Sequence, residues 1–128
     1  MIGYFDGASR GNPGEAGAGA LLLDEGENTI WETARYLGKK TNNEAEYNAA
    51  ILLLTAAKER GVKELKVYGK LVVCQLSKQW KINLPHLREL AKRAWEISEG
   101  MTVRYEWVPR AKNKRADELS NEAIDNAK

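Results

Sequence analysis

Hydrophobic and polar residues alternate along the first third of the chain, and this alternation predicts three β-strands. Residues 1–7, 16–24 and 29–37 have the two-residue period of strands that bury one face. A turn is expected at 11–14, because asparagine and glycine tolerate positive φ and proline fixes its own φ. Polar residues 25–28 separate the second strand from the third. Such short connections predict an antiparallel meander.

The period then lengthens to three and four residues, which predicts a helix over 43–60 that Gly61 ends. The remaining expected elements are a strand over 64–69, a short helix over 71–77, a helix over 84–99, a strand over 101–108 and a helix over 112–127. The order βββαβααβα predicts an α/β fold, a mixed sheet covered by helices, in a single domain spanning residues 1–128.

Composition excludes several classes of protein. The 128 residues, 43% hydrophobic and 30% charged, suit one globular domain rather than a disordered chain. The longest apolar run, residues 49–54, is far shorter than the roughly 20 residues that cross a bilayer. Residues 1–6 lack the features of a secretory signal, and the single cysteine, Cys74, excludes an internal disulfide. We therefore expect a cytoplasmic protein without a membrane segment, monomeric by default.

The net charge of +2 is unevenly distributed. Residues 1–64 carry 7 basic and 10 acidic side chains, which gives a net charge of −3. Residues 65–128 carry 13 basic and 8 acidic side chains, which gives a net charge of +5. This asymmetry suits a polyanionic partner, and it suits an ordinary solvated helix face equally well.

Asp6 is a carboxylate within an apolar strand, in phase with Ile2 and Tyr4. A buried isolated charge needs a cation, hydrogen-bond donors or a metal ion. Asp6 is therefore either a metal ligand or a hydrogen-bonded aspartate at a turn before Gly7.

Two glutamates near the start of the first helix have the spacing of a capping box. Thr41 with Glu44, or Asn43 with Glu46, satisfies this spacing, and only one box can form. The other glutamate is then available to face the same place as Asp6.

Residues 110–115 include four basic side chains and precede the last helix. Basic side chains in a loop beside carboxylates suit contact with a phosphate backbone. Asp117 and Glu118 also favour a helix N-terminus electrostatically, which is their ordinary interpretation.

Trp80 lies between two lysines and is a candidate for stacking on a sugar or base. The other tryptophans, at strand or helix spacings, are expected in the core: Trp31, Trp95 and Trp107. His86, the only histidine, has no evident catalytic companion.

The order of these motifs is more specific than any one of them. Residues 6–14, 41–46 and 107–119 together resemble type 1 ribonuclease H, and the similarity runs from residue 2 to about 127. The resemblance implies a five-stranded mixed sheet whose first three strands are antiparallel. It also implies an endonuclease that cleaves the RNA strand of an RNA/DNA hybrid with two Mg²⁺ ions, for which Mn²⁺ is a possible substitute.

The same resemblance implies roles for individual residues. Asp6, Glu46 and Asp117 match three of the family's four catalytic, metal-binding carboxylates, whereas Glu44 does not and is the better capping candidate. With Trp80, the implied nucleic-acid contacts are Asn12, Thr41, Asn42, Asn43, Arg110 and Asn113.

One departure from the family concerns the fourth strand. Family members have an Asp, usually followed by a small residue, after the glycine that ends this strand; here Lys70 follows Gly69 directly, and no acid lies between Glu64 and Glu89. We expect the charge of Lys70 to weaken binding of the water-activating ion, and residues 71–73 to repack unless the strand shortens. The alternative function is a non-catalytic module that binds RNA/DNA hybrids.

Overall fold

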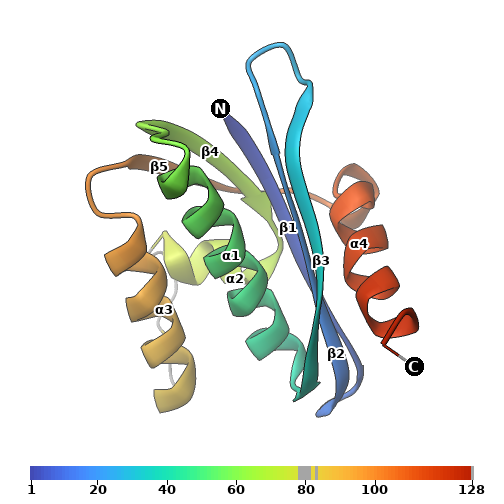
Figure 1. The fold of residues 1–128 in the computed structure, drawn as a ribbon. Helices are drawn as coiled ribbons and strands as arrows, with labels where there is room; N and C mark the ends of the chain where they lie inside the picture. Colours follow the sequence, from blue (N-terminus) through green and yellow to red (C-terminus); the bar gives the residue numbers. More distant parts are fainter. Residues whose placement is uncertain (78–81, 83, 128) are drawn as a thin grey trace.

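The computed structural model describes residues 1–77, 82 and 84–127. Five strands form one sheet in the order β3-β2-β1-β4-β5 (Figure 1). Their bounds are β1 Ile2–Gly11, β2 Gly14–Leu23, β3 Thr29–Lys40, β4 Glu64–Gly69 and β5 Thr102–Trp107. β1, β2 and β3 are antiparallel, and β4 is parallel to both β1 and β5. The predicted mixed sheet is confirmed.

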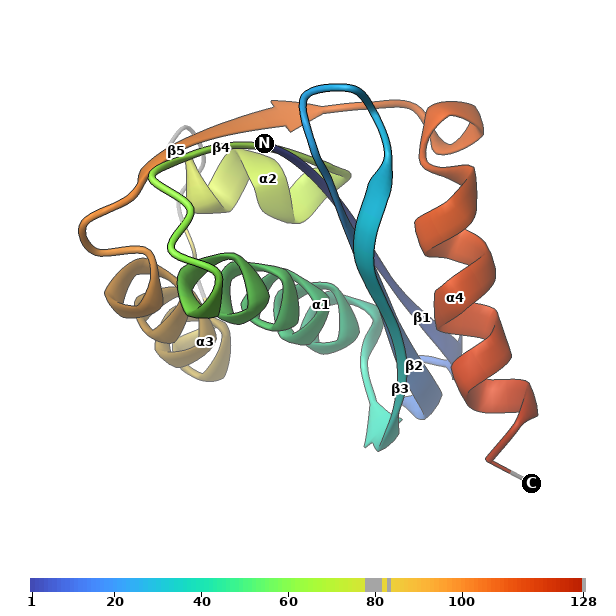
Figure 2. The ribbon, with the colours of Figure 1, turned by 45° about the horizontal axis from the view of Figure 1, so that its top comes forward.

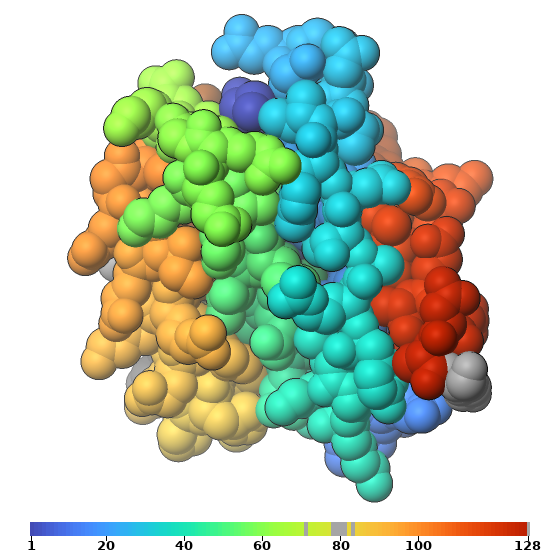
Figure 3. Space-filling model, viewed as in Figure 1, coloured from blue at the N-terminus to red at the C-terminus, as the bar shows by residue number. Residues whose placement is uncertain are grey.

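The helices cover the two faces of this sheet. Three of them, α1 (Asn42–Glu59), α2 (Leu71–Leu76) and α3 (Pro85–Ile97), lie on one side, and α4 (Lys114–Asp125) lies on the other (Figure 2). Seen from outside, β3 separates the surface of α1 and α3 from that of α4 (Figure 3). In the described part of the chain, no helix is both long and apolar enough to cross a bilayer.

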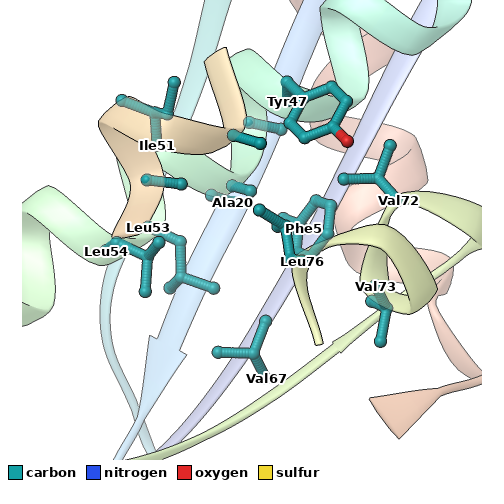
Figure 4. Packing of buried hydrophobic residues seen from close by; sticks show 14 of the residues in the cluster. Phe5, Ala20, Tyr47, Ile51, Leu53, Leu54, Val67, Val72, Val73 and Leu76 are labelled. Carbon is teal, nitrogen blue, oxygen red and sulfur yellow. The ribbon is translucent and has the colours of Figure 1, made fainter. Parts of the chain in front are cut away.

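The main hydrophobic core lies between the sheet and α1, α2 and α3. Phe5, Tyr47, Val67 and Leu76 meet there and are almost completely buried (Figure 4). Because successive side chains of a strand point to opposite faces, Phe5 enters this core while its neighbours Tyr4 and Asp6 point away from it. Tyr4 packs on the small cluster under α4. The period of β1 thus directs Asp6 out of the apolar core.

Several boundaries differ from the predictions. β1 and β2 continue to Gly11 and Gly14, which pair directly, and β3 continues to Lys40. The last helix begins at Lys114, because a 3-10 turn, η1 (Arg110–Lys112), occupies the residues before it.

Two tryptophans confirm their predicted positions and one does not. Trp31 and Trp95 pack against the core. Trp107 is 56% exposed, so its assignment to the core was wrong. It is the last residue of an edge strand, and strand periodicity does not tell where the helical cover of a sheet ends.

The connection between β4 and α2 consists of one residue, Lys70, which has a non-helical backbone with φ −97° and ψ −136°. β4 keeps all six predicted residues, so the strand is not shortened. Val72 and Val73 are buried in the main core directly after the turn. Val72 and Val73 of the short helix therefore reach the core although the helix starts immediately after the strand.

Candidate active site

Three carboxylates from three separate elements approach one another beside the middle of β1, just past its pairing with β4. Asp6 of β1 is completely buried and Glu46 of α1 is 8% exposed. The carboxyl group of Asp6 interacts with those of both Glu46 and Asp117, the latter in the first turn of α4. The structure therefore places Glu46 and Asp117 near Asp6, and their joint role in holding a metal ion stays a prediction.

Glycine at position 7 lets α1 approach β1 closely enough for this meeting. A Cβ atom on Gly7 would lie 2.3 Å from the carbonyl carbon of Ala45 and the backbone nitrogen of Glu46. The Gly7 N–H donates to Glu46 Oε1 at 3.4 Å. The backbone contact between strand and helix thus fixes the Glu46 side chain beside Asp6.

The capping box decides which glutamate is available. Thr41 is the N-cap of α1: its Oγ1 accepts from the Glu44 N–H at 3.2 Å, and its N–H donates to Glu44 Oε1 at 3.0 Å. The backbone hydrogen bond from Thr41 lowers the pKa of Glu44. Glu44 is therefore the capping residue, as predicted, and Glu46 faces the sheet.

α4 brings Asp117 to the same place by an equally close approach on the opposite face. A Cβ atom on Gly19 of β2 would lie 2.4 Å from the Ala116 carbonyl oxygen. The Asp117 side chain is 25% exposed, and its Oδ1 lies 3.6 Å from Arg110 Nη2. Asp117 is thus the most accessible of the three carboxylates.

Lys70 adds a cation to this group. β1 and β4 run parallel, with Tyr4 opposite Tyr68 and their rings stacked at 5.1 Å between centroids. Asp6 and Lys70 each follow two residues later, so they emerge side by side on the same face. Lys70 Nζ lies 3.3 Å from Asp6 Oδ1 and 3.5 Å from Oδ2.

Burial raises the pKa of both buried acids, Glu46 more than Asp6. Burial raises the pKa of Asp6, while a hydrogen bond with Glu46 and the charge of Lys70 oppose this rise. Burial, the hydrogen bond to Asp6 and the Asp6 charge raise the pKa of Glu46 well above its usual range. Two adjacent buried carboxyl groups are therefore held without enough positive charge to ionise both.

The donor set fits a divalent cation of the magnesium type. Asp6 Oδ1 and Glu46 Oε2 are buried and accept no hydrogen bond from a described residue. In the described ranges, no three Asp, Glu, His or Cys side chains are already arranged as a metal cluster. Mg²⁺ does not need such a cluster, because it prefers oxygen, retains several waters and commonly uses one or two carboxylates together with substrate phosphate.

A hollow of about 440 Å³ opens above the acids. Asn42, Asn43 and Arg110, all predicted nucleic-acid contacts, line it together with Glu46 and Asp117. Positive, amide and carboxylate groups therefore share one polar surface.

A network of hydrogen bonds holds the start of α1 against the β1–β2 turn. The Asn42 N–H donates to Asn12 Oδ1 at 3.1 Å, and Asn42 Oδ1 accepts from the Ser9 N–H at 3.0 Å. Asn12 and Asn42 are both exposed, but only Asn42 lines the hollow, whereas Asn12 lies in the turn to which Asn42 is joined. Thr41 serves mainly as the cap.

Comparison with known proteins identifies the family. A family model described as reverse transcriptase-like matches residues 4–123. A ribonuclease H from Bartonella quintana is 34% identical over 94% of this chain and 86% of its own length. The chain belongs to the type 1 ribonuclease H family. A ribonuclease HI from Halobacterium salinarum is 44% identical over 97% of this chain, which spans 64% of that relative.

Solved structures of ribonucleases H agree with this fold. RNase H1 from Halobacterium salinarum superposes with a TM-score of 0.93 at 42% identity, covering 98% of this chain and 97% of that one. LC11-RNase H1, solved in complex with an RNA/DNA hybrid, superposes with a TM-score of 0.90 at 40% identity, covering 98% of this chain and 97% of that one. The five-stranded sheet with three antiparallel strands is thus the ribonuclease H fold.

Within this ribonuclease H fold, one predicted contact has a different position. Asn113 is 1% exposed, and its Nδ2 donates to the Phe5 carbonyl oxygen at 2.8 Å. The interpretation of Asn113 as a nucleic-acid contact was wrong, because its amide fastens the start of α4 to β1. Trp80 lies outside the described residues.

Sequence reasoning also missed a residue of the hollow. Asn121 lines it and donates through Nδ2 to the Asp117 carbonyl oxygen at 2.9 Å. The available signal was helical spacing, because residues four apart share a helix face and Asp117 was already a candidate.

Proposed function

We propose that this chain hydrolyses the RNA strand of RNA/DNA hybrids in the hollow above Asp6. In this proposal Asp6, Glu46 and Asp117 are the catalytic and metal-binding residues, and Mg²⁺ or Mn²⁺ is the cofactor. The observation that carries it is the meeting of these carboxylates, from β1, α1 and α4, under a polar hollow in a chain of the ribonuclease H family. The hybrid bound by LC11-RNase H1 supports the choice of substrate.

A bound divalent ion supplies a Lewis acid for the scissile phosphate and lowers the pKa of an attacking water. The protein's own contribution is to hold the reacting groups. Asp6 and Glu46, fixed by the Gly7 contact, offer buried oxygens to the ion, and Asp117 offers a more exposed one. Arg110 and Lys70 bring positive charge to the same hollow, which suits it to a phosphate of the substrate.

Discrimination between RNA and DNA is assigned to the amide groups at the start of α1. Asn42 and Asn43 are exposed and line the hollow with Glu46 and Asp117, and the exposed Asn12 accepts a hydrogen bond from the Asn42 N–H. Amide side chains both donate and accept, as does a 2′-hydroxyl, and the wide minor groove of an A-like duplex displays those hydroxyls. We therefore propose that the RNA strand lies along these asparagines. Thr41 and Arg110 are assigned to contacts with phosphate groups.

We also propose that the fourth carboxylate of the family site is absent. The resemblance places an Asp where Lys70 now follows Gly69, and an ammonium provides no metal ligand. Turnover is therefore expected to be slow, because each 1.4 kcal/mol or so added to the barrier costs a factor of about ten in rate.

The alternative, a non-catalytic module that binds hybrids, is favoured by one observation. Lys70 neutralises Asp6 internally, which lets the acids remain beside a phosphate groove without a metal ion. This function needs hybrid binding that does not depend on divalent cations.

A cleavage assay with separately labelled strands tests the proposal. This chain, its Asp6→Asn variant and a chain with Asp-Ser inserted after Gly69 are incubated with RNA/DNA hybrid, with Mg²⁺, with Mn²⁺ or with EDTA. We expect only the RNA strand to be cut, only with metal, and at least about 100-fold faster after the insertion, equivalent to about 2.7 kcal/mol of barrier. Asp6→Asn should abolish cleavage.

Hybrid binding is measured in the same samples. Tight, metal-independent binding without cleavage by either chain would establish the non-catalytic module instead. Failure of both chains to prefer hybrid over DNA duplex would reject both functions.

A further inference from the structure

The buried carboxylate at the centre of the site already has a cation. Asp6 is completely buried, and its carboxylate forms an ion pair with the ammonium of Lys70 at 3.3 Å. The Lys70 side chain is 29% exposed and lines the hollow. One face of the ammonium thus meets Asp6, and the rest of the side chain borders the space that a ligand would enter.

The backbone on both sides of Lys70 is fixed. Lys70 is the single residue between β4 and α2, and β4 is hydrogen-bonded to β1, the strand that carries Asp6. The Val73 N–H donates to the Lys70 carbonyl oxygen at 3.1 Å, and Val72 and Val73 are anchored in the core. Because both ends of the residue are fixed, Lys70 cannot move away from Asp6 except by rotation of its side chain.

Two buried oxygens show that this cation does not saturate the acids. Asp6 Oδ1 is close to Lys70 Nζ but forms no hydrogen bond of acceptable geometry, and Glu46 Oε2 has no hydrogen-bond partner among described residues. Oxygen donors therefore remain for a second cation, which would have to approach the same carboxylate that Lys70 occupies.

We infer that Lys70 is a built-in counter-cation of the acidic centre, which competes with a divalent ion for Asp6 and sets how tightly that ion binds. This inference rests on the proposed metal site at Asp6, Glu46 and Asp117. Its physical basis is repulsion between like charges that approach one carboxylate in a poorly solvated place. A divalent ion binds only when the Lys70 ammonium turns out into the hollow.

The variant that tests this competition is Lys70→Met, which removes the charge and keeps an unbranched apolar stem. Lys66→Met is the matched control. Lys66 lies four residues earlier, in β4, and its ammonium lies 3.7 Å from Glu106 Oε1 on β5 and 5.5 Å from the centre of the Tyr68 ring, so it has partners other than Asp6. Both variants change the net charge by the same amount, so a general effect of charge appears in both.

Mn²⁺ affinity, measured by isothermal titration calorimetry on the full chain and each variant, gives the decisive readout. We expect Lys70→Met to lower the Mn²⁺ dissociation constant at least tenfold and Lys66→Met to change it less than twofold. Adding Asp6→Asn to Lys70→Met should abolish the gain. A tenfold change corresponds to about 1.4 kcal/mol.

Three other outcomes contradict the inference in distinguishable ways. Equal affinity of the unchanged chain and Lys70→Met, with binding lost in Asp6→Asn, would reject the competition and leave the proposed function standing. An equal gain in Lys66→Met would assign the effect to net charge. Absence of any Asp6-dependent Mn²⁺ binding in all variants would reject the metal site itself.

Thermal unfolding provides a second readout that does not depend on calorimetric heats. A ligand that binds only the folded state raises Tm in proportion to the logarithm of its concentration over its dissociation constant. Mn²⁺ should therefore raise the Tm of Lys70→Met more than that of the unchanged chain or Lys66→Met. A smaller rise for Lys70→Met would contradict the competition.

Discussion

Glu44 and Glu46 lie two residues apart on one helix and have opposite surroundings. Glu44 accepts the Thr41 N–H at the start of α1, whereas Glu46 is buried against Asp6. The sequence predicts that one of them is a cap and the other is available, because only one capping box can form. It does not by itself identify which, since both spacings are correct and the choice depends on where the backbone of residue 41 leaves β3.

This difference predicts opposite effects of pH on the metal-free protein. The pKa of Glu46 is raised in the folded state, so the folded chain binds more protons than the unfolded chain above the ordinary pKa of 4.5, and Glu46 makes stability fall as pH rises through its folded pKa. The pKa of Glu44 is lowered, so the stability it contributes is present above 4.5 and is lost as pH falls below that value.

Urea unfolding of the metal-free chain and two variants across pH checks these signs. Relative to the unchanged chain, Glu46→Gln should gain stability progressively above pH 4.5. Glu44→Gln, the matched control, should lose stability in the same range and converge with the unchanged chain at lower pH. If the free energies of unfolding of the unchanged chain and Glu46→Gln change with pH in the same way, the folded protein does not raise the pKa of Glu46.

The elements position the acids through two close backbone approaches, one on each face of the sheet. Gly7 admits α1 and Gly19 admits α4, and each position leaves no room for a Cβ atom. The hydrophobic period predicts both helices and the strand, but it does not show which glycine is needed for contact. That information depends on the distance between elements that are far apart in the sequence.

Gly7→Ala tests the importance of the first approach. The added methyl group would lie 2.3 Å from the α1 backbone, which cannot move aside as a side chain can. We expect a loss of at least about 2 kcal/mol, as for overpacked cores, and a lower Tm. The control is Gly26→Ala in the β2–β3 loop, where the nearest atoms are the side-chain ends of Asn28 and Asp24, at 3.1 and 3.4 Å.

Differential scanning calorimetry of both variants measures this effect. Gly7→Ala should melt several degrees below the unchanged chain, and Gly26→Ala should melt within about 2 °C of it. Equal melting temperatures for Gly7→Ala and the unchanged chain would mean that α1 is not held tightly against β1.

At the scale of the whole molecule, the sheet order explains how distant residues form one site. The sequence predicts the order of the elements and, through the family resemblance, the strand directions. The sequence shows that a lysine, Lys70, stands where the family has an aspartate. It does not predict the ion pair of Lys70 with Asp6, because that pair joins residues 64 positions apart through the parallel contact of β1 with β4. Asn113 was misassigned for a similar reason, since its partner is the Phe5 carbonyl on a distant strand.

Locating a divalent ion in crystals tests directly whether Asp6, Glu46 and Asp117 share one. Crystals soaked in Mn²⁺ and measured for its anomalous scattering should show a peak about 2.1 Å from an Asp6 oxygen and a Glu46 oxygen, with Asp117 bound directly or through water. We expect that peak to be stronger in Lys70→Met than in the unchanged chain. Absence of the peak from both crystals, or a peak only at other carboxylates, would show that these three side chains do not hold the ion.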